Sequence, residues 1–158
     1  MAARLWRIAP EAAEYTADDA TGEGARRTGG RWNRPGTPML YTSTSIALSM
    51  LETFAHLNSG SLPLNRFLVR VEVPDDMWHR AERSILDAPP VGWNSIPDSK
   101  TSHDAGEAWV AEARSALLLV PSVIVPEEVN VLINPLHPDA AVISVVKVRP
   151  CYYQSLRR

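Results

Sequence analysis

Proline and glycine are spread along the whole chain and limit it to short elements of secondary structure. The 158 residues include 13 prolines and 8 glycines, and both residue types interrupt helices and strands. Even the most apolar stretch, 116–125, is broken by Pro121 and is far too short to span a bilayer. Residues 1–7 carry no long apolar run behind their charges. The sequence therefore indicates neither secretion nor membrane insertion.

Length and composition indicate a single globular domain, 1–158. Folded domains cluster at roughly 100 to 200 residues, so two domains would both be too small. Hydrophobic residues make up 45% of the chain and charged residues 22%, which supplies a core and excludes disorder of the whole chain. Cys151 is the single cysteine, so no intramolecular disulfide can form. We expect a reducing, cytoplasmic location.

The charge balance argues against a general binder of nucleic acid. There are 16 basic and 18 acidic residues, a net charge of −2, whereas nucleic-acid-binding proteins usually carry a basic excess. Fourteen of the basic residues are arginines, whose planar fork binds carboxylate and phosphate. Four of them lie within 26–34, beside Gly29 and Gly30 and with no acid among them. This window is a candidate anion-binding loop; the alternative is a solvated basic loop with Trp32 packed into the core.

Hydrophobic patterning predicts both strands and helices. Strands are expected at 4–8, 38–42, 66–73, 117–120, 122–125 and 141–148. Helices are expected from the candidate caps 43–45 to about residue 57, around 78–86, and at 104–116. Most of 11–33 is expected to be a loop. Because strands do not strictly alternate with helices, the predicted fold class is α+β.

Glu52 stands out on the helix expected after residue 45. It lies at the border between an apolar arc and a polar face that includes Ser49, Thr53 and His56, so its carboxylate can point along the wall of a cleft. The ordinary alternative is a surface glutamate that interacts with His56 one turn on. The histidines match no metal-binding spacing, and neither a nucleophile elbow nor a catalytic setting for Cys151 is present.

A set of residues in a fixed order along the chain resembles the RES-domain family. The set is Gly30-Arg31-Trp32-Asn33, Gly36, Tyr41, Glu52, Pro121-Ser122, Asn130 and Asn134-Pro135. The resemblance covers about 4–148 and does not extend to the tail, 149–158. Members of this family are toxins of bacterial toxin–antitoxin pairs whose partner is an Xre-type helix-turn-helix antitoxin. The resemblance implies a fold similar to ADP-ribosyltransferases, with NAD bound as a substrate in a central cleft and no cofactor or metal.

The resemblance also implies roles for individual residues. The catalytic set is Arg31, Tyr41, Glu52 and Ser122, and the NAD-binding set is Arg31, Trp32, Asn33, Tyr41, Ser43 and Glu52. Arg31 is expected to pair with the pyrophosphate, and the ring of Tyr41 to stack on the cationic nicotinamide, a contact worth about 0.5–2 kcal/mol. Glu52 is expected to stabilise the oxocarbenium-like cation that forms on the ribose, and Ser122 to bond Glu52 or the ribose.

The implied function is depletion of cellular NAD by hydrolysis or phosphorolysis of the nicotinamide–ribose bond, which arrests growth. Transfer of ADP-ribose to a cellular protein by the same cleft stays open as an alternative. A non-catalytic or RNA-cleaving module is a third possibility, which the lack of a basic surplus and of paired histidines disfavours. We expect the antitoxin to cover the active site in a hetero-oligomer and to make any DNA contact itself. Whether 11–33 closes over the substrate is open.

Overall fold

The computed structural model describes residues 2–57 and 63–156 and contains one antiparallel sheet of six strands in the order β4-β5-β2-β1-β3-β6. The strands are β1 (Ala2–Pro10), β2 (Leu40–Ser43), β3 (Arg66–Pro74), β4 (Leu117–Pro121), β5 (Val129–Ile133) and β6 (Ser144–Pro150). The helices are α1 (Glu23–Thr28), α2 (Ile46–Ala55), α3 (Asp75–His79), α4 (Ser84–Asp87) and α5 (Lys100–Glu112), with 3-10 turns η1 (Pro138–Val142) and η2 (Tyr153–Leu156). The predicted α+β class is confirmed. Within these ranges no helix has the length and apolar character to cross a membrane.

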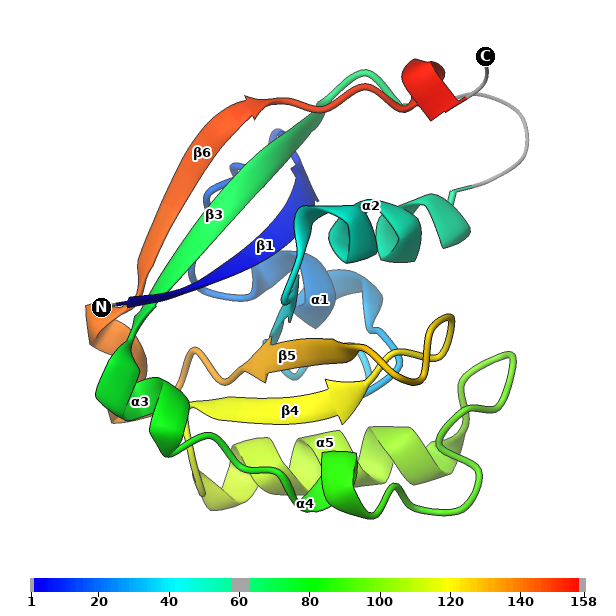
Figure 1. Ribbon diagram of the computed structural model, residues 1–158, viewed down its shortest axis with the longest axis vertical. Coiled ribbons are helices and arrows are strands. Elements are labelled where there is room, and N and C mark those ends of the chain that lie inside the picture. The colour runs from blue at the N-terminus through cyan, green and yellow to red at the C-terminus, as the bar shows by residue number, and fades with distance from the viewer. Residues whose placement is uncertain (1, 58–62, 157–158) are drawn as a thin grey trace.

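The sheet is divided in its middle. In the described chain β1 and β2 share a single pair, Trp6 opposite Ser43. Beyond it, β1 pairs with β3 along all nine of its residues, and β2 pairs with β5 along all four. The sheet therefore has two halves, β4-β5-β2 and β1-β3-β6, that meet at this pair. In Figure 1 the β1-β3-β6 half runs diagonally through the upper part of the molecule, and β4 and β5 lie below it above α5.

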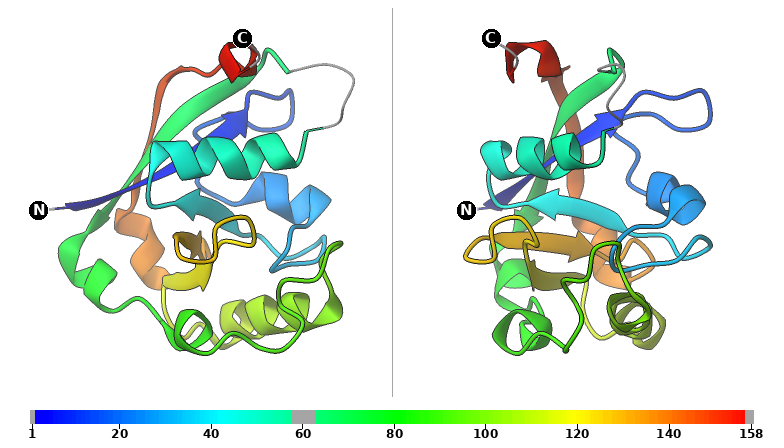
Figure 2. Two further views of the ribbon diagram at one scale, coloured as in Figure 1. Left: turned by 45° about the vertical axis from the view of Figure 1, so that its right-hand side comes forward. Right: turned by 90° about the vertical axis from the view of Figure 1, so that its right-hand side faces the viewer.

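Three apolar clusters hold the halves and their covering helices together. The first joins the two halves and includes Leu5, Val71 and Val131, all at most 1% exposed. The second packs α5 and Trp32 against β4 and β5. The third packs α2 and Tyr153 against β1 and β3, and α2 lies across the sheet in both views of Figure 2. Burial of apolar surface, at about 25 cal/mol per Å², thus stabilises each half and also packs the two halves against each other.

Helix α2 confirms the prediction for this segment. The Oγ of Ser45 accepts a hydrogen bond from the amide of Leu48 at 3.1 Å, which satisfies one of the free amides at the helix start. The helix ends at Ala55 rather than Leu57. Its end is held by the tail, because the hydroxyls of Thr53 and Tyr153 lie 2.5 Å apart. Residues 157 and 158 of the tail lie outside the described residues.

Around the β4–β5 turn one strand prediction fails, and one strand of the structure was not predicted. Residues 122–125 form a turn rather than a strand, because the Oγ of Ser122 accepts hydrogen bonds from the amides of Ile124 and Val125 at 3.1 and 3.0 Å. Strand β5 was not expected from the sequence, and it supplies the pairing partner of both β2 and β4. Side-chain capping of backbone amides competes with strand pairing. The segment of β5, Val129–Ile133, is rich in β-branched residues, a strand signal that the predictions left out.

Several helix boundaries also differ from the predictions. The expected loop 11–33 contains α1, and the helix expected around 78–86 is replaced by the short helices α3 and α4. Helix α5 begins four residues before the predicted 104 and ends at Glu112. There Ala113 takes a left-handed conformation with φ of 49°, which stops the helix. The polar first turn of α5 gave no apolar periodicity by which to place its start.

Candidate active site

The divergence of the two half-sheets opens into a cleft of about 620 Å³, a usual size for a small-molecule site. Five of the seven residues singled out in the sequence line it, namely Arg31, Trp32, Tyr41, Ser43 and Glu52. The other two, Asn33 and Ser122, are fully buried and do not line it. Each of these two hydrogen-bonds a residue that does. The structure therefore brings the whole predicted set to one place.

Glu52 is held by two hydrogen bonds to one of its carboxylate oxygens. Its Oε1 accepts from the Oγ of Ser122 at 2.5 Å and from the Nδ2 of Asn130 at 2.8 Å. Its Oε2 has no hydrogen-bond partner among the described residues. The predicted contact between Ser122 and Glu52 is thus present, and the result is a carboxylate with one oxygen fixed and the other available in the cleft.

Tyr41 is anchored through its hydroxyl and contributes its ring to the cleft. The hydroxyl donates to the Oδ1 of Asn33 at 2.6 Å and accepts from the amide of Trp32 at 3.0 Å. Burial raises the pKa of this hydroxyl, so it remains protonated. Gly30 permits the arrangement, because a Cβ at this position would lie 2.6 Å from the Tyr41 hydroxyl. Asn33 therefore positions Tyr41 and the loop rather than facing the cleft.

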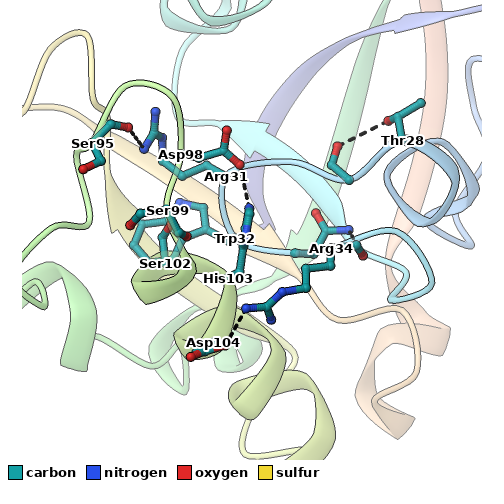
Figure 3. Close-up of polar contacts among 12 residues, drawn as sticks. Thr28, Arg31, Trp32, Arg34, Ser95, Asp98, Ser99, Ser102, His103 and Asp104 are labelled. Atoms are coloured by element: carbon teal, nitrogen blue, oxygen red, sulfur yellow. Dashed lines mark hydrogen bonds and ion pairs between the residues drawn. The ribbon is translucent and has the colours of Figure 1, made fainter.

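The loop that carries Trp32 is pressed against α5. A Cβ at Gly106 would lie 1.9 Å from the carbonyl oxygen of Trp32, so this close approach requires glycine. Arg34 clamps the same contact through ion pairs to Asp104, at 2.7 Å, and to Glu107; Figure 3 shows the first of these. The loop thus has a fixed position relative to the helix.

The basic window 26–34 contributes one arginine to the cleft rather than four. Arg26 and Arg27 pair with Glu23 at 2.5 and 2.7 Å, and these contacts lower the pKa of Glu23 to about 2. Arg34 pairs with α5 as described above. The anion-binding interpretation therefore fails for three of the four arginines, because acids from outside the window pair with them, and the alternative is right that Trp32 packs into the core. Arg31 remains.

Arg31 links the glycine loop to the segment before α5. Its Nη1 donates to the carbonyl oxygens of Trp93, at 2.9 Å, and Ser95, at 2.8 Å, and Figure 3 shows the side chain reaching Ser95. Nearby, the Nε2 of His103 lies 2.6 Å from Asp98, which also lines the cleft. Burial acts to raise the pKa of Asp98, but the His103 contact and the charge of Arg31 outweigh it and lower that pKa.

Arg7 is a site residue that the sequence analysis missed. It lines the cleft from β1, and its Nε is buried with no hydrogen-bond partner among the described residues. Burial lowers its pKa, and the nearby Asp19 and Tyr15 act in the opposite direction. The available signal was its register, because strand alternation places Arg7 on the same face as the buried residues Leu5 and Ala9. A buried arginine with a free donor suits an anionic ligand.

The remaining lining residues favour an anion at this cleft over other surfaces. Arg66 and His56 add to the basic side chains, against the carboxylates of Glu52 and Asp98. A second groove, of about 470 Å³, is lined by acidic side chains near Glu72 and lacks any basic residue. Within the described ranges, no three His, Cys, Asp or Glu side chains lie close enough to hold a metal ion.

Tyr41→Phe tests the anchoring of the Tyr41 hydroxyl, because it keeps the ring. We expect it to lower the free energy of unfolding by about 1–3 kcal/mol, since the Trp32 amide and the Asn33 Oδ1 lose their partner in the interior. Urea unfolding followed by tryptophan fluorescence measures the change. Tyr15→Phe is the matched control and should alter stability by less than about 0.5 kcal/mol. Equal losses in the two variants would contradict the assignment.

Comparison with known proteins identifies the family. A family model described as the RES domain matches residues 4–154. The "Prs ADP-ribosylating toxin" of Sphingobium sp. (strain YBL2) is 53% identical over 153 residues, 97% of this chain and 95% of that protein. "Toxin Res" of Yersinia enterocolitica is 38% identical over 136 residues, 84% of each chain. "Toxin Res" of Pseudomonas putida is 35% identical over 138 residues, 86% of this chain and 87% of that protein.

The fold is also found in a solved structure. The chain aligns with a chain of the M. tuberculosis MbcT–MbcA toxin–antitoxin complex at a TM-score of 0.63 and 22% identity, covering 99% of this chain and 90% of that one. At this identity the likeness supports the fold and no more. The family match and the three relatives carry the classification. The chain belongs to the RES-domain family and is a toxin of that family.

Proposed function

We propose that the cleft binds NAD and breaks the bond between nicotinamide and ribose. The observation that carries the proposal is the Glu52 carboxylate, which lines the cleft with Oε1 fixed by Ser122 and Asn130. Cleavage of this bond builds positive, oxocarbenium-like charge on the ribose. A carboxylate that is already in place stabilises that charge without reorganising during the reaction.

Cleavage of the nicotinamide–ribose bond requires few catalytic residues, because nicotinamide is a good leaving group. Nicotinamide is cationic while attached to the ribose, and it leaves as a neutral molecule with the bonding electron pair. No general acid has to protonate it, so the chain needs neither a metal nor a second catalytic carboxylate for this step. The ribosyl cation that remains forms a new bond with a nucleophile, which gives up its proton.

The other lining residues suit the rest of the dinucleotide. The ring of Tyr41 offers a face on which the cationic nicotinamide can stack. The pyrophosphate carries two negative charges, and the unpaired Nε of Arg7 is a donor already buried in the cleft. Arg31 and Arg66 lie in the same cleft, although the Nη1 of Arg31 is engaged by two carbonyl oxygens. We propose Arg7 as the principal contact to the pyrophosphate, assisted by Arg31.

Substitution of Glu52 tests the proposal. We expect the toxin to release nicotinamide from NAD in a cell extract that supplies the acceptor, and Glu52→Gln to lower the rate by about 100- to 1000-fold, because the neutral amide no longer stabilises the cation. Chromatographic detection of nicotinamide measures the rate. Glu127→Gln, an exposed glutamate in the β4–β5 turn, is the control and should match the wild type. A folded wild-type protein as inactive as Glu52→Gln would refute the proposal.

The second product depends on the nucleophile, and we propose a protein as the acceptor of ADP-ribose. The relative with 53% identity is named an ADP-ribosylating toxin, which favours transfer to a protein over the NAD depletion expected from the sequence. Both reactions share the cleavage step. Depletion requires water or phosphate to capture the cation.

Labelled NAD distinguishes the two outcomes. After incubation of the toxin with a cell extract and NAD labelled in the adenylate half, we expect label on a discrete protein band, absent with Glu52→Gln. Gel autoradiography and chromatography of the soluble products provide the measurement. Label confined to free ADP-ribose or its phosphorylated form would overturn the transfer proposal and support NAD depletion.

A toxin with this activity has to be restrained in the cell that makes it, and we propose an antitoxin that covers the cleft. The solved structural neighbour is part of a toxin–antitoxin complex, which supports a partner of this kind, and the family resemblance suggests the Xre type. Such pairs commonly assemble with point symmetry. Light scattering of the co-expressed pair should give a mass above that of one toxin plus one antitoxin. Elution of the two proteins as separate species would contradict the proposal.

A further inference from the structure

A continuous set of polar side chains connects Glu52 to the junction of the two half-sheets. The Oγ of Ser43 donates to the Oδ1 of Asn130 at 2.7 Å, and the Nδ2 of Asn130 donates to Glu52. Ser43 and Asn130 are also direct partners in the β2–β5 ladder. On its other side Ser43 faces Trp6 of β1. Backbone pairing on both sides therefore fixes the position of the serine hydroxyl.

The donors and acceptors permit only one direction for these hydrogen bonds. An amide presents either its NH2 or its oxygen to a neighbour, and an oxygen facing the Glu52 carboxylate at 2.8 Å would be repelled. The NH2 of Asn130 therefore faces Glu52, which turns its oxygen to Ser43, and the single hydrogen of the Ser43 hydroxyl fills that oxygen. Ser122 is directed likewise, because its oxygen accepts two backbone amides and leaves its hydrogen for Glu52.

The consequence is a carboxylate that cannot turn freely. Two donors approach the same oxygen from different elements, Ser122 from the turn after β4 and Asn130 from β5. Rotation of the carboxylate would break both bonds. The free Oε2 is therefore held in one direction in the cleft, although Glu52 itself lies on α2, whose surface residues have several rotamers available.

We infer that Asn130 and Ser43 are positioning residues for the cleavage step. Asn130 holds the Glu52 carboxylate in its reactive orientation, and Ser43 holds the amide of Asn130. Ser43 therefore acts through Asn130 and not by binding NAD, the role expected for it from the sequence. This inference rests on the proposed NAD cleavage. It predicts that loss of either side chain lowers kcat and leaves KM for NAD nearly unchanged.

Two substitutions test the inference in the full-length protein. Asn130→Asp has the same shape but replaces the NH2 donor with an oxygen, which sets two carboxylates against each other; we expect kcat for nicotinamide release to fall about 100-fold. Ser43→Ala frees the amide of Asn130 to turn, and we expect kcat to fall about 10-fold. In both variants KM should stay within about twofold of wild type. Thermal unfolding identifies any general loss of structure.

Thr44→Ala is the matched control. The hydroxyl of Thr44, just after β2, also forms a hydrogen bond to β5, at 3.2 Å to the carbonyl oxygen of Val129, and in the described chain it makes no hydrogen bond to Asn130 or Glu52. A positioning role predicts wild-type kcat for Thr44→Ala and a reduced kcat for Ser43→Ala. Equal losses in these two variants would reduce Ser43 to a structural residue. A raised KM with unchanged kcat in Ser43→Ala would make it a substrate contact, and either result overturns the inference.

A crystal structure of Ser43→Ala separates this inference from the reaction itself. If the wild-type protein releases no nicotinamide, the proposed NAD cleavage is refuted. The crystal structure of Ser43→Ala still tests whether Ser43 holds the amide of Asn130 toward Glu52. We expect the amide of Asn130 to turn and its nitrogen to leave hydrogen-bond distance of the Glu52 Oε1. A variant in which this contact persists with the wild-type length refutes the role of Ser43, whatever the substrate of the cleft.

Discussion

The pairing of Trp6 with Ser43 is the contact on which the rest of the site depends. It is the single pair that joins β1 to β2 in the described chain, while each strand pairs along its whole length with β3 or β5 on its other edge, so the two half-sheets separate from this point. Ser43 is also the last residue of β2, two residues before the cap of α2. The same short segment therefore joins the half-sheets, starts the helix that carries Glu52, and orients the side chain that holds Glu52.

The electrostatics of the cleft follow from local pairing and not from the total charge. The net charge of the chain is −2, yet three arginines, Arg7, Arg31 and Arg66, line the cleft. The acids Glu23, Asp104 and Glu107 are paired with arginines that do not line it. Burial then decides what the remaining arginines do. An exposed arginine such as Arg27 is satisfied by Glu23, whereas the buried Nε of Arg7 lacks a partner in the described chain. In the proposed function, the unsatisfied donor of Arg7, and not the densest run of arginines, is the contact for the anion.

The sequence predicted the elements that carry strong local signals. Helix α2 has both a broad apolar arc and a capping serine, and β3 has clean alternation ended by Pro74, so both were placed correctly. The site set was predictable only through the family resemblance, since Glu52 by itself is an ordinary surface glutamate. Arg7 and β5 carried local signals that the predictions left out, namely strand alternation for Arg7 and a β-branched run for β5. What the sequence does not show is which strands are neighbours, and so that Arg7 and Asn130 line the same cleft.

The hydrogen bonds of Glu52 explain how so small a domain can hold a reactive carboxylate. A glutamate on a helix surface would ordinarily move among rotamers, and its charge would be spread over several positions. Here one donor comes from the half-buried Asn130 on β5 and the other from Ser122, which is fully buried after β4, so the direction of the carboxylate is set by these two elements and not by the helix alone. The nucleophile faces no such constraint from these contacts. In the proposed reaction, the hydrogen bonds to Glu52 therefore act on cleavage of the donor and leave the choice of acceptor unconstrained.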